Sequence, residues 1–303
     1  MSRRAGLPGP GRAPGVRPGR RERSGWSGPG RARGVRAALG ELTMIAVGVL
    51  FAFPFYVFLS ISLKSPDEVA ADPLGPPSGL HLDNYTTAWR EARLGQALFN
   101  STVVAVISVA LLVALGSLAA YTIARRAGRL SYATYVLFLL GIMIPLQLGM
   151  VPLYQLMRDA NLLQTYTSLI IFNVGSQLPM TVFLYAGFTR ALPREYEEAA
   201  CVDGAGTLRT FLGVVFPLLR PVTGTVVIIS AINVWNEFLT PLLYVGGSDQ
   251  QTLPVAIFAF RGEFSTDWGV IFAGMVLAIL PILLVYFLLQ KSIIKGFASG
   301  LKG

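Results

Sequence analysis

This chain of 303 residues consists of long apolar blocks separated by polar stretches, and six blocks are almost entirely apolar. Each block holds about 20 residues, the length that an α-helix needs to cross the hydrocarbon core of a bilayer. The expected blocks are 42–63, 98–120, 132–154, 166–188, 222–245 and 270–290. Internal prolines at Pro54, Pro145, Pro179 and Pro281 predict kinks in four of them. The pattern predicts an all-α membrane protein built as a six-transmembrane-helix bundle.

A polar segment from Thr189 to Pro221 separates the fourth block from the fifth. Pro193 suits the first turn of a helix, and three glutamates follow it near the positive end of the helix dipole. Gly204 predicts a C-terminal turn, and Thr207 can cap a second helix. That helix would carry one apolar stripe, made by Leu208, Phe211, Leu212 and Val215. The segment is therefore predicted to fold as a helix, a turn and a second helix.

Basic residues are distributed unevenly around the six blocks. Ten of the 25 arginines and lysines precede position 37, in a stretch rich in Gly and Pro. Such a composition buries too little surface to offset its ordering entropy, so residues 1–41 are predicted to be a disordered basic tail and residues 42–303 the transmembrane domain. In all, twenty basic residues fall on the side of the two termini and five on the other side. By the positive-inside rule, both termini and the 189–221 segment are cytoplasmic, and the tail anchors the chain at the bilayer rather than binding nucleic acid.

The side chains that common enzymes need are scarce. Cys201 is the only cysteine and His81 the only histidine, so neither a cysteine metal cluster nor a Ser-His-Asp triad has its parts. The sequence also lacks the glycine-rich phosphate loop with its lysine, so this chain cannot hydrolyse ATP by that route. We therefore expect no enzyme, no bound metal and no bound cofactor.

Polar residues inside the blocks are the candidates for a transport pathway. Asn173 and Gln177 lie four residues apart and share a helix face, which suits either a polar strip or hydrogen bonds between helices. Trp235 could stack on a sugar ring or serve as an interfacial anchor. Asn236 and Glu237 follow it, and a carboxylate at membrane depth either faces an aqueous cavity or pairs within the bundle.

The polar segment also carries a family resemblance. Glu198-Ala199-Ala200, then Gly204, then Val214, Phe216 and Pro217 resemble, in order and spacing, the EAA loop of ABC importer permeases. Further patches from Asn84 to the C-terminus resemble the carbohydrate-type branch, which includes the maltose-type inner-membrane permeases. They are Asn84-Tyr85, Asn100-Ser101, 151–154, 161–165, 235–239 and 295–303.

The resemblance implies a permease fold with a cytoplasmic coupling helix in a prokaryotic cell membrane. Its coupling residues would be Glu198, Ala199, Ala200, Asp203 and Gly204. It implies four kinds of partner: a second homologous permease, a dimer of ATP-binding subunits that holds the ATP and Mg, an extracytoplasmic solute-binding protein, and a carbohydrate or related small solute. The chain would then form half of a translocation pathway.

Other interpretations stay open at this point. The polar segment could be an ordinary interfacial loop in which Glu198 pairs only with Arg194, four residues earlier. The chain could also be an ion-coupled secondary carrier, or a membrane scaffold or sensor that transports nothing. Uptake driven by an ion gradient without an ATPase would indicate the carrier, and absence of uptake would indicate the scaffold.

Overall fold

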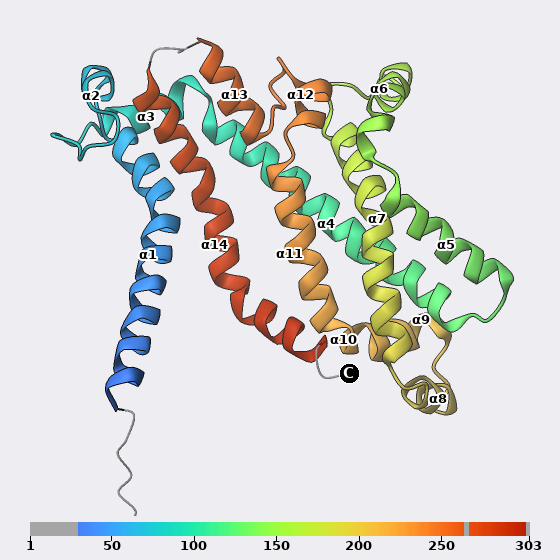
Figure 1. Ribbon diagram of the computed structural model, residues 1–303. Coiled ribbons are helices and arrows are strands. Elements are labelled where there is room, and N and C mark those ends of the chain that lie inside the picture. Colours follow the sequence, from blue (N-terminus) through green and yellow to red (C-terminus); the bar gives the residue numbers. More distant parts are fainter. Residues whose placement is uncertain (1–29, 264–266, 301–303) are drawn as a thin grey trace, which may run out of the picture. The chain divides into compact units, whose positions relative to one another are not determined.

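The fold is known from a computed structural model, which describes residues 30–263 and 267–300 (Figure 1). The chain divides into two compact units, residues 1–52 and 53–303. Helix α1 spans Gly30–Ser62. Residues 1–29 of the expected tail lie outside the described residues, whereas 30–41 are helical, in a stretch that contains the good helix formers Ala and Arg.

Every regular element in the described part of the chain is a helix. In the second unit, short helices α2 (Pro66–Ala71) and α3 (Asp83–Glu91) precede α4 (Leu94–Arg125). The remaining helices are α5 (Arg129–Met143), α6 (Met150–Asp159), α7 (Tyr166–Ala191), α8 (Glu195–Val202), α9 (Thr207–Thr210), α10 (Phe216–Leu218), α11 (Arg220–Asn236), α12 (Leu239–Val245), α13 (Leu253–Glu263) and α14 (Trp268–Gly300). Short 3-10 and π-helical turns span Leu146–Gly149 and Phe211–Val215.

Three helices are long and apolar enough to cross a membrane, at Gly40–Ser62, Leu94–Arg125 and Tyr166–Ala191. They correspond to the first, second and fourth expected blocks. Two bent helix pairs raise the number to five if each pair forms one span. The sixth block lies in α14, whose Trp268–Pro281 part is a shorter apolar helix. The all-helical class is confirmed, and three to five spans follow from length and composition.

The third expected block is not one helix. It breaks after α5 at Ile144-Pro145, and the helical run Leu146–Asp159 leaves at 92° to α5. Ile144 has φ −75° and ψ 120°, the extended conformation that a following proline favours. The prediction of a kink at Pro145 was too weak, because the proline ends the helix.

The fifth expected block, 222–245, is also divided. Helix α11 ends at Asn236, Glu237 is extended with φ −63° and ψ 126°, and α12 starts at Leu239. At its other end, α11 bends by 76° from the helical run Thr207–Leu218. The polar residues of this block therefore lie at a break between helices rather than inside a continuous span.

Helices α4 and α7 pack closely, and Figure 1 shows them crossing in the centre of this unit. Gly116 permits the approach, since a Cβ added there would overlap the Cγ2 methyl of Thr181 and lie 3.2 Å from its Cβ. One apolar core gathers around this pair toward the C-terminal end of α4. It includes Ile123, Val182, Tyr185, Phe211, Val215 and Leu219.

A second core joins the N-terminal half of α4 to α6, α7 and α12, through Val104, Met157, Leu169, Phe172, Tyr244 and Val245. A third core joins α3 and the start of α4 to α13 and α14. There Gly269 lets the backbone of α14 approach the Asn84 amide, which also donates to the carbonyls of Ser62 and Lys64. Asn84 lies in the first turn of α3.

Candidate functional site

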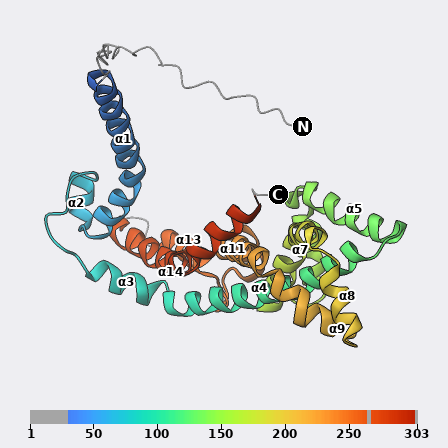
Figure 2. The same ribbon diagram turned by 90° about the horizontal axis from the view of Figure 1, so that it is seen from below.

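The polar segment folds as the predicted helix, turn and second helix. Helix α8 is eight residues long, with Glu195, Glu197 and Glu198 in its first turn. Figures 1 and 2 show α8 and α9 next to each other. The second helix runs on through the π-helical turn Phe211–Val215 into α10. The sequence signals of this segment therefore predict its local structure well.

Gly204 forms the turn that ends α8. Its φ of +80° lies in the left-handed region, which glycine adopts at no steric cost. The N–H of Gly204 donates to the carbonyl of Cys201 at 3.0 Å, and the N–H of Ala205 donates to the carbonyl of Ala200 at 2.9 Å. These two bonds make a Schellman motif, so the predicted C-terminal turn is confirmed.

Two details of the second helix differ from the prediction. Thr207 is its first residue and not its cap, because Gly206 occupies the cap position and no side chain bonds there. The apolar stripe divides in two: Phe211 and Val215 are buried, but Leu208 and Leu212 are 62% and 57% exposed. Residues four apart share a face, so the exposed leucines form a second, outward apolar face.

The outward surface of this segment is hollowed. An open depression of about 920 Å³ is lined by Gly204, Gly206, Thr207, Leu208, Arg209, Leu212 and Gly213. Nearby on α8, Val202 is 87% exposed. Exposed apolar side chains around a depression mark a surface that another molecule can cover.

The predicted coupling residues do not all face outward. Glu198, Ala199, Asp203 and Gly204 are exposed, whereas Ala200 is 9% exposed and packs against the protein's own helices. The inward carboxylate is Glu197, which no sequence signal distinguished from its neighbours. Its Oε1 lies 2.6 Å from Nε of Arg125, at the last turn of α4. Among the described residues no ion pair joins Glu198 to Arg194, so the interfacial-loop interpretation lacks its proposed contact.

Asn173 and Gln177 have different surroundings although they share a face of α7. Asn173 is buried, and its amide donates to the carbonyl of Leu169 in its own helix at 2.9 Å. Gln177 lines a cavity of about 160 Å³ between α7 and α11, together with Ser230 and Asn233. The structure thus places Gln177 at a cavity with both polar and apolar lining residues, and Asn173 in helix packing.

Trp235, Asn236 and Glu237 lie at the C-terminal end of α11 and in the break that follows it. Trp235 packs at the edge of two apolar cores, and the Asn236 amide donates to the Ile232 carbonyl at 2.9 Å. Oε1 of Glu237 accepts a hydrogen bond of 3.1 Å from the N–H of Thr240. Since the first N–H groups of a helix lack partners within it, Glu237 stabilises the start of α12.

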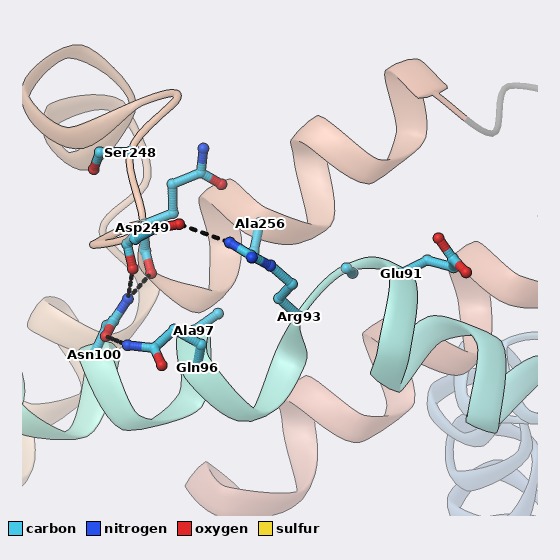
Figure 3. A pocket seen from close by; sticks show the side chains of 10 residues that line it. Glu91, Arg93, Gln96, Ala97, Asn100, Ser248, Asp249 and Ala256 are labelled. Carbon is cyan, nitrogen blue, oxygen red and sulfur yellow. Dashed lines mark hydrogen bonds and ion pairs between the residues drawn. The ribbon is translucent and has the colours of Figure 1, made fainter.

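A further pocket of about 160 Å³ lies at the N-terminal end of α4 (Figure 3). Arg93 and Asp249 form an exposed ion pair of 2.6 Å at its rim. At its base, Asn100 donates to the carbonyls of Asp249 and Gln251 at 2.9 and 2.8 Å. The side-chain oxygen Oδ1 of Asn100 accepts from Gln96 and Tyr166 at 3.0 and 2.7 Å. Asn100 therefore fixes the loop after α12 against α4.

Residues 112–298, more than half of the chain, match the family described as the binding-protein-dependent transport system inner membrane component. The chain belongs to this family. The matched range contains the whole 189–221 segment, so the resemblance drawn from the EAA spacing is confirmed at the level of the family. Members are transport permeases and not enzymes, which confirms the expectation that this chain is not an enzyme.

Curated relatives cover nearly the whole chain. The melibiose/raffinose/stachyose import permease protein MelC of Bacillus subtilis is 37% identical over 262 residues, which are 86% of this chain and 95% of that protein. The multiple sugar-binding transport system permease protein MsmG of Streptococcus mutans is 34% identical, over 84% of this chain and 92% of that protein. Membership of this family implies a partner permease, an ATPase and a solute-binding protein.

A solved structure shows the same fold. It is a bacterial ABC transporter involved in the import of the acidic polysaccharide alginate, and one of its chains matches with a TM-score of 0.74 at 20% identity. The match covers 86% of this chain and 97% of that chain. The all-helical architecture described above is therefore that of an ABC transporter permease, and its apolar helices place this family member in a membrane.

Proposed function

We propose that this permease imports a carbohydrate by coupling to a separate ATPase through helix α8. The observation that carries the proposal is the two-sided character of α8. Its inner side is fixed to α4 by a part-buried ion pair, and its outer side exposes Glu198, Ala199 and Val202 beside an open depression. A short helix whose inner side is held rigidly and whose outer side is exposed suits the transmission of force from a docked subunit.

The proposed coupling surface is a revised version of the one expected from the sequence. It consists of Glu198, Ala199, Asp203 and Gly204, with the exposed Leu208 and Leu212 added. Ala200 supports α8 from the inside, because its methyl group is nearly buried. ATP and Mg would be bound by the partner ATPase, and this chain would hold no cofactor.

Six spans with both termini in the cytoplasm remain our proposal for the topology. In addition to the three continuous helices, the bent run Arg129–Asp159, α11 and α14 would supply the remaining three spans. The excess of basic residues near the termini and in the 189–221 segment supports this orientation. It would put α8 on the cytoplasmic face and the pocket at Asn100 on the opposite face, where a solute-binding protein arrives.

The solute is proposed from the relatives. MelC is named for melibiose, raffinose and stachyose, and AmyC of Thermoanaerobacterium thermosulfurigenes for starch degradation products. A carbohydrate fits the uncharged polar groups at the α7–α11 cavity, which are the side chains of Gln177, Ser230 and Asn233. Among the pathway candidates we keep Gln177, while Asn173, Trp235, Asn236 and Glu237 have packing or hydrogen-bonding roles that account for their positions.

Attachment of the ATPase tests the coupling surface. We would replace Ala199 by Trp on the exposed side of α8, and as a matched control replace the exposed Ala127 by Trp in the turn after α4. Purification of the transporter from membranes should recover the ATPase subunit with the unaltered protein and with Ala127→Trp, but not with Ala199→Trp. Equal recovery with both variants would contradict the assignment of α8.

Uptake tests the transport activity and separates it from the alternatives. Cells that lack this permease, and cells complemented with it, would be given radiolabelled melibiose, raffinose or maltose. We expect restored uptake of one of these sugars, and loss of that uptake when the ATPase is inactivated. Uptake that persists on an ion gradient without the ATPase would indicate a secondary carrier, and equal counts for all sugars with and without the permease would contradict carbohydrate import.

A further inference from the structure

The last turn of α4 contacts both helices of the 189–221 segment. Arg125 donates from Nε to Oε1 of Glu197 at 2.6 Å, and from Nη2 to the carbonyl of Leu192 at 3.0 Å. The hydroxyl of Tyr121, one turn earlier on α4, donates to the second oxygen of Glu197 at 3.0 Å. The Tyr121 ring also packs 5.1 Å from the ring of Phe211 in the second helix.

These contacts are shielded from water. The side chains of Arg125 and Glu197 are only 12% and 15% exposed. A guanidinium that donates to a carboxylate and to a carbonyl at once has little freedom to reorient, because its donors lie in a fixed plane. Removal of one partner from such a pair is costly, since the remaining charge stays buried. The bonds therefore hold α8, the end of α7 and the end of α4 in one arrangement.

The neighbouring basic residue provides a contrast. Arg126 is exposed, as expected of an arginine that only marks the cytoplasmic side of a span. Arg125 differs because it turns inward to a carboxylate from a helix 72 residues further along the chain. Arg125 lies where α4, α7 and α8 meet. It therefore has a mechanical role in addition to marking one side of the membrane.

We propose that Tyr121, Arg125 and Glu197 are positioning residues that fasten the coupling helix to α4, so that α8 and the end of α4 move as one body during the ATPase cycle. The inference rests on the proposed function of α8. Covalent linkage already connects α8 to α7 and, through α9 and α10, to α11. The three side chains add a non-covalent route into α4, which is remote from α8 in sequence and packs along α7.

Distance measurement between two spin labels tests the proposal on the complete transporter in nanodiscs. The single native Cys201 is exposed on α8 and takes one label, and an Ala127→Cys substitution just beyond α4 takes the other. Distances would be measured without nucleotide and after trapping with ATP and vanadate. We expect one narrow distance that is the same in both states.

Without the bonds that join Glu197 to α4, the two labels should move independently of each other. With Glu197→Ala we expect the narrow distribution to be lost and the distance to depend on nucleotide state. Tyr121→Phe removes only one hydroxyl and keeps the ring against Phe211, so it should give a partial effect even where Glu197→Ala fails to insert. Thr122→Val is the matched control, because the exposed Thr122 hydroxyl donates only to Leu118 of its own helix.

Two results would overturn the inference while leaving the proposed function intact. One is a distance that changes with nucleotide in the otherwise unaltered transporter, and the other is an unchanged distribution in both Glu197→Ala and Tyr121→Phe. If no ATPase subunit is recovered even with the unaltered chain, the proposed function fails and this inference fails with it.

Discussion

Replacement of Gly116 by Ala should destabilise the contact between α4 and α7. The new Cβ would overlap the Thr181 methyl, and Thr181 has little room to move because it is 3% exposed and its hydroxyl donates to the Gln177 carbonyl at 2.9 Å. Overpacking of this kind costs about 3 kcal/mol at its upper range. The gain in helix propensity from Gly to Ala offsets about 1 kcal/mol. The expected net loss is therefore about 2 kcal/mol, which corresponds to roughly 5 °C in the unfolding temperature.

The measurement is thermal unfolding of the purified protein in detergent, followed by intrinsic fluorescence. Gly187→Ala in α7 is the control, because a Cβ there has no neighbour within 4 Å and should leave stability equal or slightly higher. The double variant Gly116→Ala with Thr181→Ser removes the overlapping methyl and should recover most of the loss. If Gly116→Ala is as stable as Gly187→Ala, or if the serine restores nothing, the close approach of the two helices is not as described.

Three further pairs of substitutions have defined outcomes. Asn100→Asp places a carboxylate against two carbonyl oxygens and should lower the free energy of unfolding in denaturant by about 3 kcal/mol. Arg93→Ala removes an exposed ion pair and should lower it by less than about 1 kcal/mol. Equal losses in the two variants would refute the role of Asn100. Gly204→Ala forces a side chain into φ +80° and should cost about 1–2 kcal/mol, while Gly206→Ala, at φ −72°, should cost much less in the same assay. Glu237→Gln keeps the oxygen that caps α12 and should preserve stability and uptake, whereas Glu237→Ala should lose about 1 kcal/mol; lost uptake with Glu237→Gln at full stability would reassign this residue to the pathway.

The sequence predicted those features that depend on local chemistry. Apolar blocks indicate helices, and Gly204 indicates the turn after α8, because hydrophobic periodicity and the conformational freedom of glycine act over a few residues. Pro145 was correctly marked as a point of irregularity. A proline kink and a helix break have the same sequence signal, however, and the 92° turn depends on the packing of the following helix against its neighbours.

The inward face of α8 could not be predicted in the same way. Three glutamates occupy its first turn, and their order along the chain does not say which one meets a cation. From the sequence, Arg125 is only one of the twenty basic residues counted on the side of the two termini. The ion pair depends on two residues far apart in sequence that the packing of α4 against α7 brings together. Likewise, the sequence predicted that Glu237 is a carboxylate at membrane depth. Its role in capping α12 depends on a helix break, which the composition of the block does not reveal.

Helix α4 combines the features of a lever. Its close contact with α7 at Gly116 lies roughly 33 Å from Leu94 and roughly 14 Å from Arg125, at 1.5 Å per residue. A rigid helix that tilts together with α7 about the level of Gly116 would move its Asn100 end in the direction opposite to its Arg125 end. The unequal arms would enlarge the movement more than twofold at the tip near Leu94. A small displacement of α8 would thus become a larger one at the pocket beneath Arg93 and Asp249.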